Sequence, residues 1–257
     1  MPLPLVVPYH LDEHLPDLDL LLPPGAAAET VTVELPEGDP WDRMARLHDR
    51  VADLVADRVR GNAVPAVLSG DCMVALGVLA GLQRAGVQPA LVWFDAHGDL
   101  QTLETSASGY LGGIPLRILT GYRPELSADR LGLRPLATDR VVLVDGRDLD
   151  PPEETYLATA GIHRSTVPGL TATTLPPGPL MLHLDADVID PGELPEPRYP
   201  APRGPSAAEV LAAVRRVFDT GRVVAYDLGC TWKPRREVPS ATRARLLDTL
   251  LLTSCTW

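Results

Sequence analysis

The sequence is poor in aromatic residues, in cysteine and in net positive charge, and each shortage argues against a class of protein. Phe, Trp and Tyr make up 5% of the 257 residues, too few for an aromatic-rich recognition surface. Three widely spaced cysteines in a chain of this length do not indicate a disulfide framework. A formal net charge of −11, with its 23 Lys and Arg residues scattered, argues against nucleic acid as a partner.

Long hydrophobic runs are also missing. No stretch reaches the length of a membrane-spanning helix, and residues 1–10 lack the basic, apolar and small-residue regions of a signal peptide. We therefore expect a cytoplasmic protein. With 45% hydrophobic and 22% charged residues, the chain has enough apolar content for one large domain covering residues 1–257.

Short apolar runs that stop abruptly at polar or glycine residues predict an α/β fold with buried parallel strands. These runs are residues 63–68, 90–94, 141–144, 180–184 and 223–226. Segments of helical period lie between them, such as residues 42–59, and Ser206 with Glu209 forms a capping box before another helix. Right-handed βαβ crossovers would place the carboxyl ends of all these strands at one rim, where ligands bind.

Metal-binding residue types follow two of these predicted strands. Asp95, His97 and Asp99 recur at every second position, so that an extended segment would carry them on one side. Asp185 and Asp187 repeat this spacing after a later strand. Carboxylates with an imidazole suit a divalent ion such as Mn²⁺, and four aspartates buried together without cations would be costly. The alternative is that the two clusters lie apart on the surface as turn and cap residues.

In their order along the chain, these motifs resemble the ureohydrolase family of arginases and agmatinases over about residues 63–234. The resemblance implies a three-layer α/β/α sandwich with a mainly parallel eight-stranded sheet and a centre of two Mn²⁺ ions. It further implies that Asp99 is catalytic and orients the attacking hydroxide. The metal ligands implied by motif position are Cys72 and Asp99 on one ion, His97 and Asp187 on the other, and Asp95 and Asp185 between them.

The substrate-binding side resembles arginase more than agmatinase. Residues 147–153 are similar to the arginase segment in which an acidic residue contacts the substrate α-amino group, and Asp150 is the implied counterpart. Asp148 and Asp150 would, in the alternative, only cap a helix that begins near Glu153. An amino-acid substrate is therefore expected. The residues proposed to contact it are Gln101, Ser106 and Ser108 at the carboxylate end, and Asp148, Asp150, Glu153 and Cys230 elsewhere.

Three positions depart from the family pattern. Cys72 stands where the family has a histidine. Either its thiolate binds the ion, or it is only a small buried cysteine and the site is one ligand short. The acid/base histidine of the family falls on Gly112, and the glutamate that faces the guanidinium falls near Cys230. These losses predict poor activity on arginine, whose guanidinium stays protonated and whose departing amine must gain a proton.

The same substitutions, Cys72 and Gly112, resemble the Nω-hydroxy-L-arginine amidinohydrolases of D-cycloserine biosynthesis, which release hydroxyurea and L-ornithine. The resemblance thus implies a role in antibiotic biosynthesis with a small guanidino amino acid as substrate. Two alternatives remain. One is another ureohydrolase, namely an arginase, a guanidino-acid hydrolase or a formimidoyl hydrolase, and the other is an inactive arginase-like binding protein. Because arginase-like trimers rely on a longer C-terminal tail than the one following the helical segment 242–252, a monomer is expected.

Overall fold

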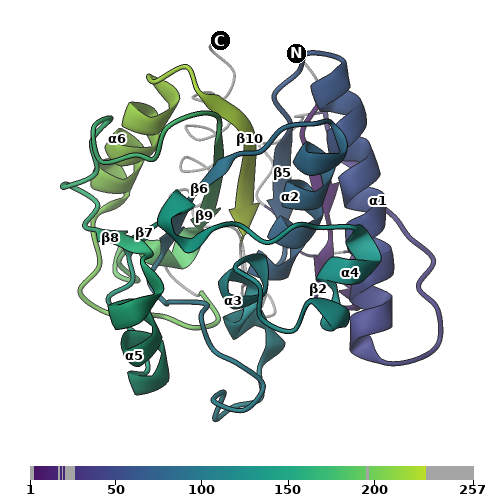
Figure 1. Ribbon diagram of the computed structural model, residues 1–257, viewed down its shortest axis with the longest axis horizontal. Helices are drawn as coiled ribbons and strands as arrows, with labels where there is room; N and C mark the ends of the chain where they lie inside the picture. Colours follow the sequence, from purple (N-terminus) through teal and green to yellow (C-terminus); the bar gives the residue numbers. More distant parts are fainter. Residues whose placement is uncertain (1–2, 17, 19, 21–26, 195–196, 230–257) are drawn as a thin grey trace.

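The computed structural model describes residues 3–16, 18, 20, 27–194 and 197–229, and these residues form a parallel sheet covered by helices (Figure 1). The sheet has eight strands in the order β4-β1-β5-β10-β9-β6-β7-β8, and every neighbouring pair is parallel. The eight strands are β1 (Leu5–Val7), β4 (Glu29–Thr30), β5 (Ala66–Ser69), β6 (Ala90–Asp95), β7 (Val141–Asp145), β8 (His163–Ser165), β9 (Leu180–Asp185) and β10 (Val223–Gly229).

Strands β6 and β9 are buried along their whole length, which explains why their sequences read as unbroken apolar runs. The five strands predicted from apolar runs are all present, with boundaries displaced by up to three residues. Strands β1, β4 and β8 were not predicted, because each is only two or three residues long. A separate two-stranded antiparallel sheet pairs β2 (Tyr9–His10) with β3 (Glu13–His14).

Helices cover the sheet on both faces. Two of them, α1 (Pro40–Arg60) and α2 (Ala75–Arg84), pack against each other in one hydrophobic core, and α6 (Ala207–Phe218) belongs to a second core on the opposite face. The three-layer α/β/α sandwich is therefore confirmed (Figure 1). The shorter helices are α3 (Pro115–Leu119), α4 (Ala128–Leu131) and α5 (Pro151–Ala160).

Local sequence signals set the helix boundaries. Helix α1 begins after Asp39, whose carboxylate accepts hydrogen bonds from the backbone N–H groups of Trp41 and Asp42. The predicted capping box at α6 is confirmed: the Ser206 backbone N–H donates to Glu209 Oε2 at 2.8 Å, and the Glu209 N–H donates back to Ser206 Oγ at 3.3 Å. The predicted helical segment 242–252 lies outside the described residues.

Among the helices that the structure describes, none is both long enough and apolar enough to cross a lipid bilayer.

Candidate metal centre and substrate cavity

The six predicted ligands all lie at or just after the carboxyl ends of three strands of the sheet, β5, β6 and β9. Strand β5 leads into a short 3₁₀ helix, η1 (Cys72–Val74), whose first residue is Cys72. Strands β6 and β9 end in Asp95 and Asp185. His97 and Asp99 lie in the loop after β6, and Asp187 lies in the 3₁₀ helix η5 (Ala186–Val188) after β9. Parallel topology thus carries residues from three distant segments to one rim.

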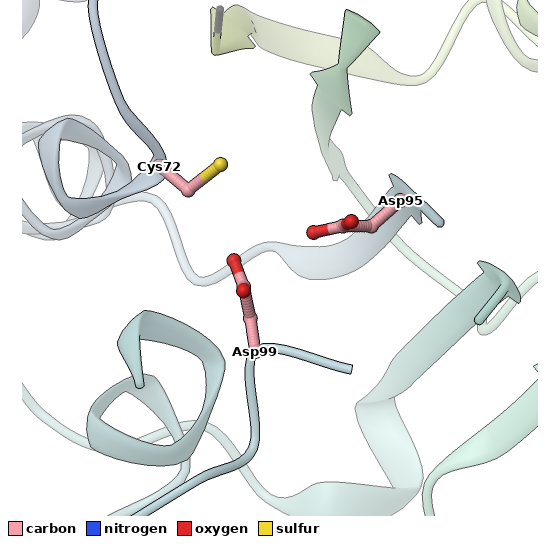
Figure 2. A group of neighbouring side chains, drawn as sticks. All are labelled: Cys72, Asp95 and Asp99. Carbon is pink, nitrogen blue, oxygen red and sulfur yellow. The ribbon is translucent and has the colours of Figure 1, made fainter. Parts of the chain in front are cut away.

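One group of potential ligands consists of Cys72, Asp95 and Asp99 (Figure 2). One ligand atom from each residue lies within 4.8 Å of the others, and all three residues are buried. Figure 2 shows the side chain of Cys72 facing those of Asp95 and Asp99, which come from the end of β6 and the loop after it. Asp185 adjoins this group, because its Oδ2 accepts a hydrogen bond from Cys72 Sγ at 2.9 Å.

A second group consists of Asp95, His97 and Asp187. His97 Nδ1 lies 3.1 Å from Asp187 Oδ2 and 3.4 Å from Asp95 Oδ1. Asp95 belongs to both groups, so it is the residue that two neighbouring cations would share. The structure therefore brings five of the predicted ligands together in two groups that share Asp95, and the sixth, Asp185, is hydrogen-bonded to Cys72 of the first group.

Backbone and indole N–H groups hold the carboxylates in place. Asp95 Oδ2 accepts a hydrogen bond from Trp93 Nε1 at 3.0 Å, and its Oδ1 accepts one from the His97 backbone N–H at 2.7 Å. The Asp187 N–H donates to Asp185 Oδ1 at 2.9 Å. Such contacts around a metal centre fix ligand orientation before any cation arrives.

Burial makes this cluster electrostatically unfavourable without cations. Burial and the nearby carboxylate of Asp95 raise the pKa of Asp99 well above its ordinary value, and burial with Asp187 does the same for Asp185. The pKa of Asp187 rises to about 6 through burial and the charge of Asp95. Burial acts to lower the pKa of His97, but hydrogen bonds to Asp187 and Asp95 outweigh it and raise that pKa to about 12.

The donor set fits divalent cations. It combines carboxylate oxygens, one imidazole and one thiol, and burial and Asp185 raise the pKa of the Cys72 thiol, so that a nearby cation is needed to favour the thiolate. Asp99 Oδ2 is buried and has no hydrogen-bond partner among the described residues. An unpartnered buried carboxylate oxygen among like charges is what a cation would satisfy.

The ligand cluster opens into a cavity of about 300 Å³. All the predicted substrate-contact residues that the structure describes line this cavity together with five of the six ligands. These residues are Gln101, Ser106, Ser108, Asp148, Asp150 and Glu153, beside Cys72, His97, Asp99, Asp185 and Asp187. Cys230, the remaining candidate, lies outside the described residues.

Some of these residues also have a structural role. Asp150 is the N-cap residue of α5, as the helix-cap alternative predicts, yet its Oδ2 also accepts a hydrogen bond from Gln101 Nε2 at 2.6 Å at the cavity. Both carboxylate oxygens of Glu153 accept backbone N–H groups, from Leu100 at 2.9 Å and from Asp150 at 3.0 Å. Glu153 therefore connects α5 to the loop that carries Asp99. Asp150 both caps α5 and lines the cavity.

Sequence reasoning missed several residues of the site. Tyr110 and Tyr199 line the cavity, although neither stood out in the sequence. His183 is fully buried behind the ligands, where its Nδ1 lies 2.8 Å from Asp227 Oδ2 and its ring stacks on Trp93 at 3.6 Å. The signal for His183 was present, since a histidine interrupts an otherwise apolar strand two residues before Asp185.

Comparison with known proteins places the chain in a family. The model of the Arginase family matches residues 23–251. The arginase of Bacillus subtilis (strain 168) is 30% identical over 193 residues, which cover 70% of this chain and 65% of that protein. The Nω-hydroxy-L-arginine amidinohydrolase of Streptomyces lavendulae is 30% identical over 184 residues, which cover 69% of this chain and 64% of that protein. These matches span just under two thirds of each relative's length.

The fold comparison agrees. A crystal structure of arginase from Bacillus subtilis superposes with a TM-score of 0.81 at 24% identity, covering 99% of this chain and 98% of that one. The fold and the side-chain cluster define an α/β protein with a group of potential metal ligands at the carboxyl ends of its strands. More particularly, the chain belongs to the arginase family, as the sequence motifs predicted.

Proposed function

We propose that this chain is a binuclear manganese amidinohydrolase that cleaves Nω-hydroxy-L-arginine to hydroxyurea and L-ornithine and acts poorly on L-arginine. The observation that carries the proposal is the pair of ligand groups sharing Asp95 at the base of a cavity whose wall includes the side-chain-free Gly112. The relative from Streptomyces lavendulae, whose name states this activity, supports the choice of substrate.

Two cations would be held by the six residues of the cluster, Cys72, Asp95, His97, Asp99, Asp185 and Asp187. When bound, divalent cations supply Lewis acidity that makes water nucleophilic near neutral pH. Within the chain, Asp99 is suited to orient the attacking water, because its Oδ2 is buried in the cavity wall without a partner among the described residues.

The outer cavity suits an amino acid. Asp148 and Asp150 place negative charge where a substrate α-ammonium group would gain from it, and Ser106 and Ser108 offer hydroxyl donors for a carboxylate. Gln101 connects the two sides, since its amide donates to Asp150 while its Oε1 accepts from Thr105 at 2.7 Å. Hydrolysis adds water to the guanidine carbon and breaks its bond to the ornithine nitrogen, which leaves with the electron pair and gains a proton.

Substrate basicity decides between hydroxyarginine and arginine. A guanidinium stays protonated far above neutral pH, and placing it beside metal cations costs electrostatic energy unless a counter-charge is present. N-hydroxylation lowers guanidine basicity, so the hydroxylated substrate can enter uncharged. Gly112 supplies no side chain that could shuttle a proton, which again favours the less basic substrate.

Product analysis tests this proposal. Purified protein loaded with manganese is given Nω-hydroxy-L-arginine and L-arginine in parallel, and hydroxyurea, urea and ornithine are quantified. We expect hydroxyurea and ornithine in equal amounts from the first substrate and slow urea release from the second. Equal or faster cleavage of arginine would overturn the specificity, and no turnover of either would overturn the activity.

One observation favours another ureohydrolase reaction as a second candidate. Asp150 is already engaged by Gln101 and by its place at the start of α5, so that its carboxylate has structural reasons to be there. A guanidino-acid or formimidoyl substrate without a free α-amino group would not need the Asp150 carboxylate for binding. Asp150→Asn separates the two, since it raises KM for an amino-acid substrate but leaves KM for a guanidino acid unchanged.

A further inference from the structure

A row of three buried side chains crosses the middle of the sheet, next to the strand ends that carry the potential ligands. In the parallel register, His183 of β9 lies opposite Asp227 of β10 on one side and opposite Trp93 of β6 on the other. All three residues are fully buried. They therefore lie side by side on three adjacent strands, although they are far apart in the sequence.

Direct contacts join this row to the ligand cluster. His183 Nδ1 lies 2.8 Å from Asp227 Oδ2, and because a carboxylate oxygen accepts, the imidazole N–H donates. The ring of His183 stacks on Trp93 with a centroid separation of 3.6 Å and an interplanar angle of 20°. The Trp93 indole Nε1 in turn donates to Asp95 Oδ2 at 3.0 Å. These contacts form a continuous path from Asp227 to the aspartate that both ligand groups share.

His183 also lies close to the first ligand group. A Cβ atom built on Gly229 would lie 3.2 Å from Cε1 of His183 and 3.1 Å from Sγ of Cys72. Both distances are shorter than ordinary van der Waals contact, so the imidazole edge and the thiol both lie against the backbone of Gly229. The imidazole is therefore a direct neighbour of the site and not a distant core residue.

Stability alone does not explain a polar pair at this place. Burying a histidine and a carboxylate removes their hydration, and apolar residues of similar volume are often as stable or more stable in the same space. Apart from Asp185 at its end, His183 is the only polar residue of β9. The pair is better explained by the side chains that it orients, as are the outer hydrogen bonds around many metal centres.

We propose that His183 is a positioning residue of the metal centre. Anchored by Asp227, its ring holds the Trp93 indole in place. The indole N–H thereby fixes the Asp95 carboxylate, which two cations would share. A carboxylate held in one orientation loses less freedom when cations bind, so cation affinity depends on the row. This inference rests on the metal centre of the proposed function and not on its substrate.

A double-mutant cycle with Mn²⁺ alone tests the path. Full-length, metal-free protein is titrated with Mn²⁺ by calorimetry. Trp93→Phe keeps a ring but removes the N–H, and His183→Asn offers an amide donor to Asp227 but removes the ring. Each should weaken Mn²⁺ binding on the order of tenfold. The double variant should also lose only about tenfold, because without the indole N–H the ring position no longer affects Asp95.

Two outcomes of the cycle would overturn the proposal. One is wild-type Mn²⁺ affinity in either single variant. The other is a loss of about 100-fold in the double variant, the product of two independent effects.

Matched controls for both substitutions come from α1. Trp41→Phe removes an indole N–H at the start of this helix, and His48→Asn replaces a histidine that is also fully buried. Both variants should bind Mn²⁺ with wild-type affinity, because both residues belong to the helix layer and not to the strand ends. A tenfold loss in either control, on the order expected for the row, would mean that affinity follows general stability and would overturn the assignment.

Variants of Asp227 test the anchor with less risk to folding. Asp227→Asn and Asp227→Val lose the same negative charge, but only asparagine keeps an oxygen that can accept from His183 Nδ1. Mn²⁺ should therefore bind about fivefold more weakly to the valine variant than to the asparagine variant, the effect of one hydrogen bond. Equal affinity in the two variants would overturn the role of the anchor, and with it the proposal.

Failure of the proposed function can be told apart from failure of this inference, because no substrate enters the titrations. Wild-type protein that binds Mn²⁺ but hydrolyses neither amino acid contradicts the proposed reaction, and the variants then still decide the role of His183. Wild-type protein that binds no Mn²⁺ overturns both.

Discussion

Two tightly buried regions of the molecule differ in what their burial achieves. Helices α1 and α2 meet through small residues: a Cβ on Gly77 would lie 2.7 Å from the His48 carbonyl oxygen, and one on Gly81 would lie 2.6 Å from that of Ala52. At the strand ends, the ligand cluster buries carboxylates such as Asp99 and Asp185 equally well. The helix interface removes apolar surface from water and stabilises the fold, whereas the cluster collects like charges.

The difference separates the contacts that stabilise the fold from the side chains that are placed to bind a ligand. Close packing needs no external partner, because its energy comes from groups already in the chain. The carboxylate cluster is stabilised only by protons or cations, as the raised pKa values of Asp99 and Asp185 indicate. A region whose stability depends on something added to the protein is the one expected to bind a ligand.

The largest expected effect comes from removing one charge of the cluster with Asp99→Asn. Asparagine has nearly the same shape and tolerates the left-handed backbone of this residue, whose φ is 52°. Under the proposed function, hydrolysis should fall on the order of 100-fold or more, since one of the six proposed metal ligands is lost. The metal-free variant should nevertheless be more stable than wild type above neutral pH.

The sign of that stability change follows from the pKa. The folded-state pKa of Asp99 is raised above its unfolded value, so the unfolded chain binds fewer protons and wild-type stability falls as pH rises between the two values. Because asparagine does not titrate, the Asp99→Asn variant lacks this pH-dependent loss of stability. Chemical denaturation of metal-free protein at pH 5 and pH 8 measures it, with the exposed Asp129→Asn as control. Equal destabilisation of both variants at pH 8 would contradict the assignment.

Gly81→Leu tests the helix interface with the next largest effect. The new side chain meets Ala52 O at 2.6 Å and Val55 Cβ at 2.7 Å, which should cost about 3 kcal/mol through overpacking. Leucine is a good helix former, so helix propensity cannot explain a loss. Arg46→Leu, on the exposed side of α1, is the control and should change the free energy of unfolding by less than about 0.5 kcal/mol. Similar losses in both variants would rule out close packing as the cause.

His48 brings a titratable group into the apolar helix layer. It is fully buried, and desolvation lowers its pKa from 6.5 to about 3. Because the unfolded chain gains a proton below pH 6.5 while the folded protein does not, stability is lost as pH falls from 6.5 towards 3. The difference in unfolding free energy between His48→Leu and wild type should therefore shift by about 2 kcal/mol in favour of the variant from pH 7 to pH 5.

His163→Gln provides the control for that measurement, because it removes a histidine from the exposed surface instead of the apolar helix layer. A pH-independent difference for His48→Leu would mean that the imidazole finds a proton acceptor in the folded protein.

The sequence predicted the parts of the site that depend on local pattern. Apolar runs located the strands, and the spacing of Asp95 and Asp99 was readable because each follows the end of such a run. Contacts made by tertiary packing were not readable. The pairing of His183 with Asp227 joins two adjacent strands that are 44 positions apart in sequence. The ring of Tyr110 is packed between His10 of strand β2 and Tyr199, two residues far from it in the sequence.

The smallest effect is expected where neither buried charge nor close packing is involved, at the start of α6. Ser206→Ala removes the hydroxyl that accepts the Glu209 N–H, and should cost about 1 kcal/mol in unfolding free energy. Ser206→Asp keeps an acceptor at the same place and should recover most of that stability. Manganese affinity should be identical in the three proteins, because the cap is exposed and belongs to the helix on the other face of the sheet. A change in metal affinity would show that the helix layers and the strand-end cluster are not energetically separate.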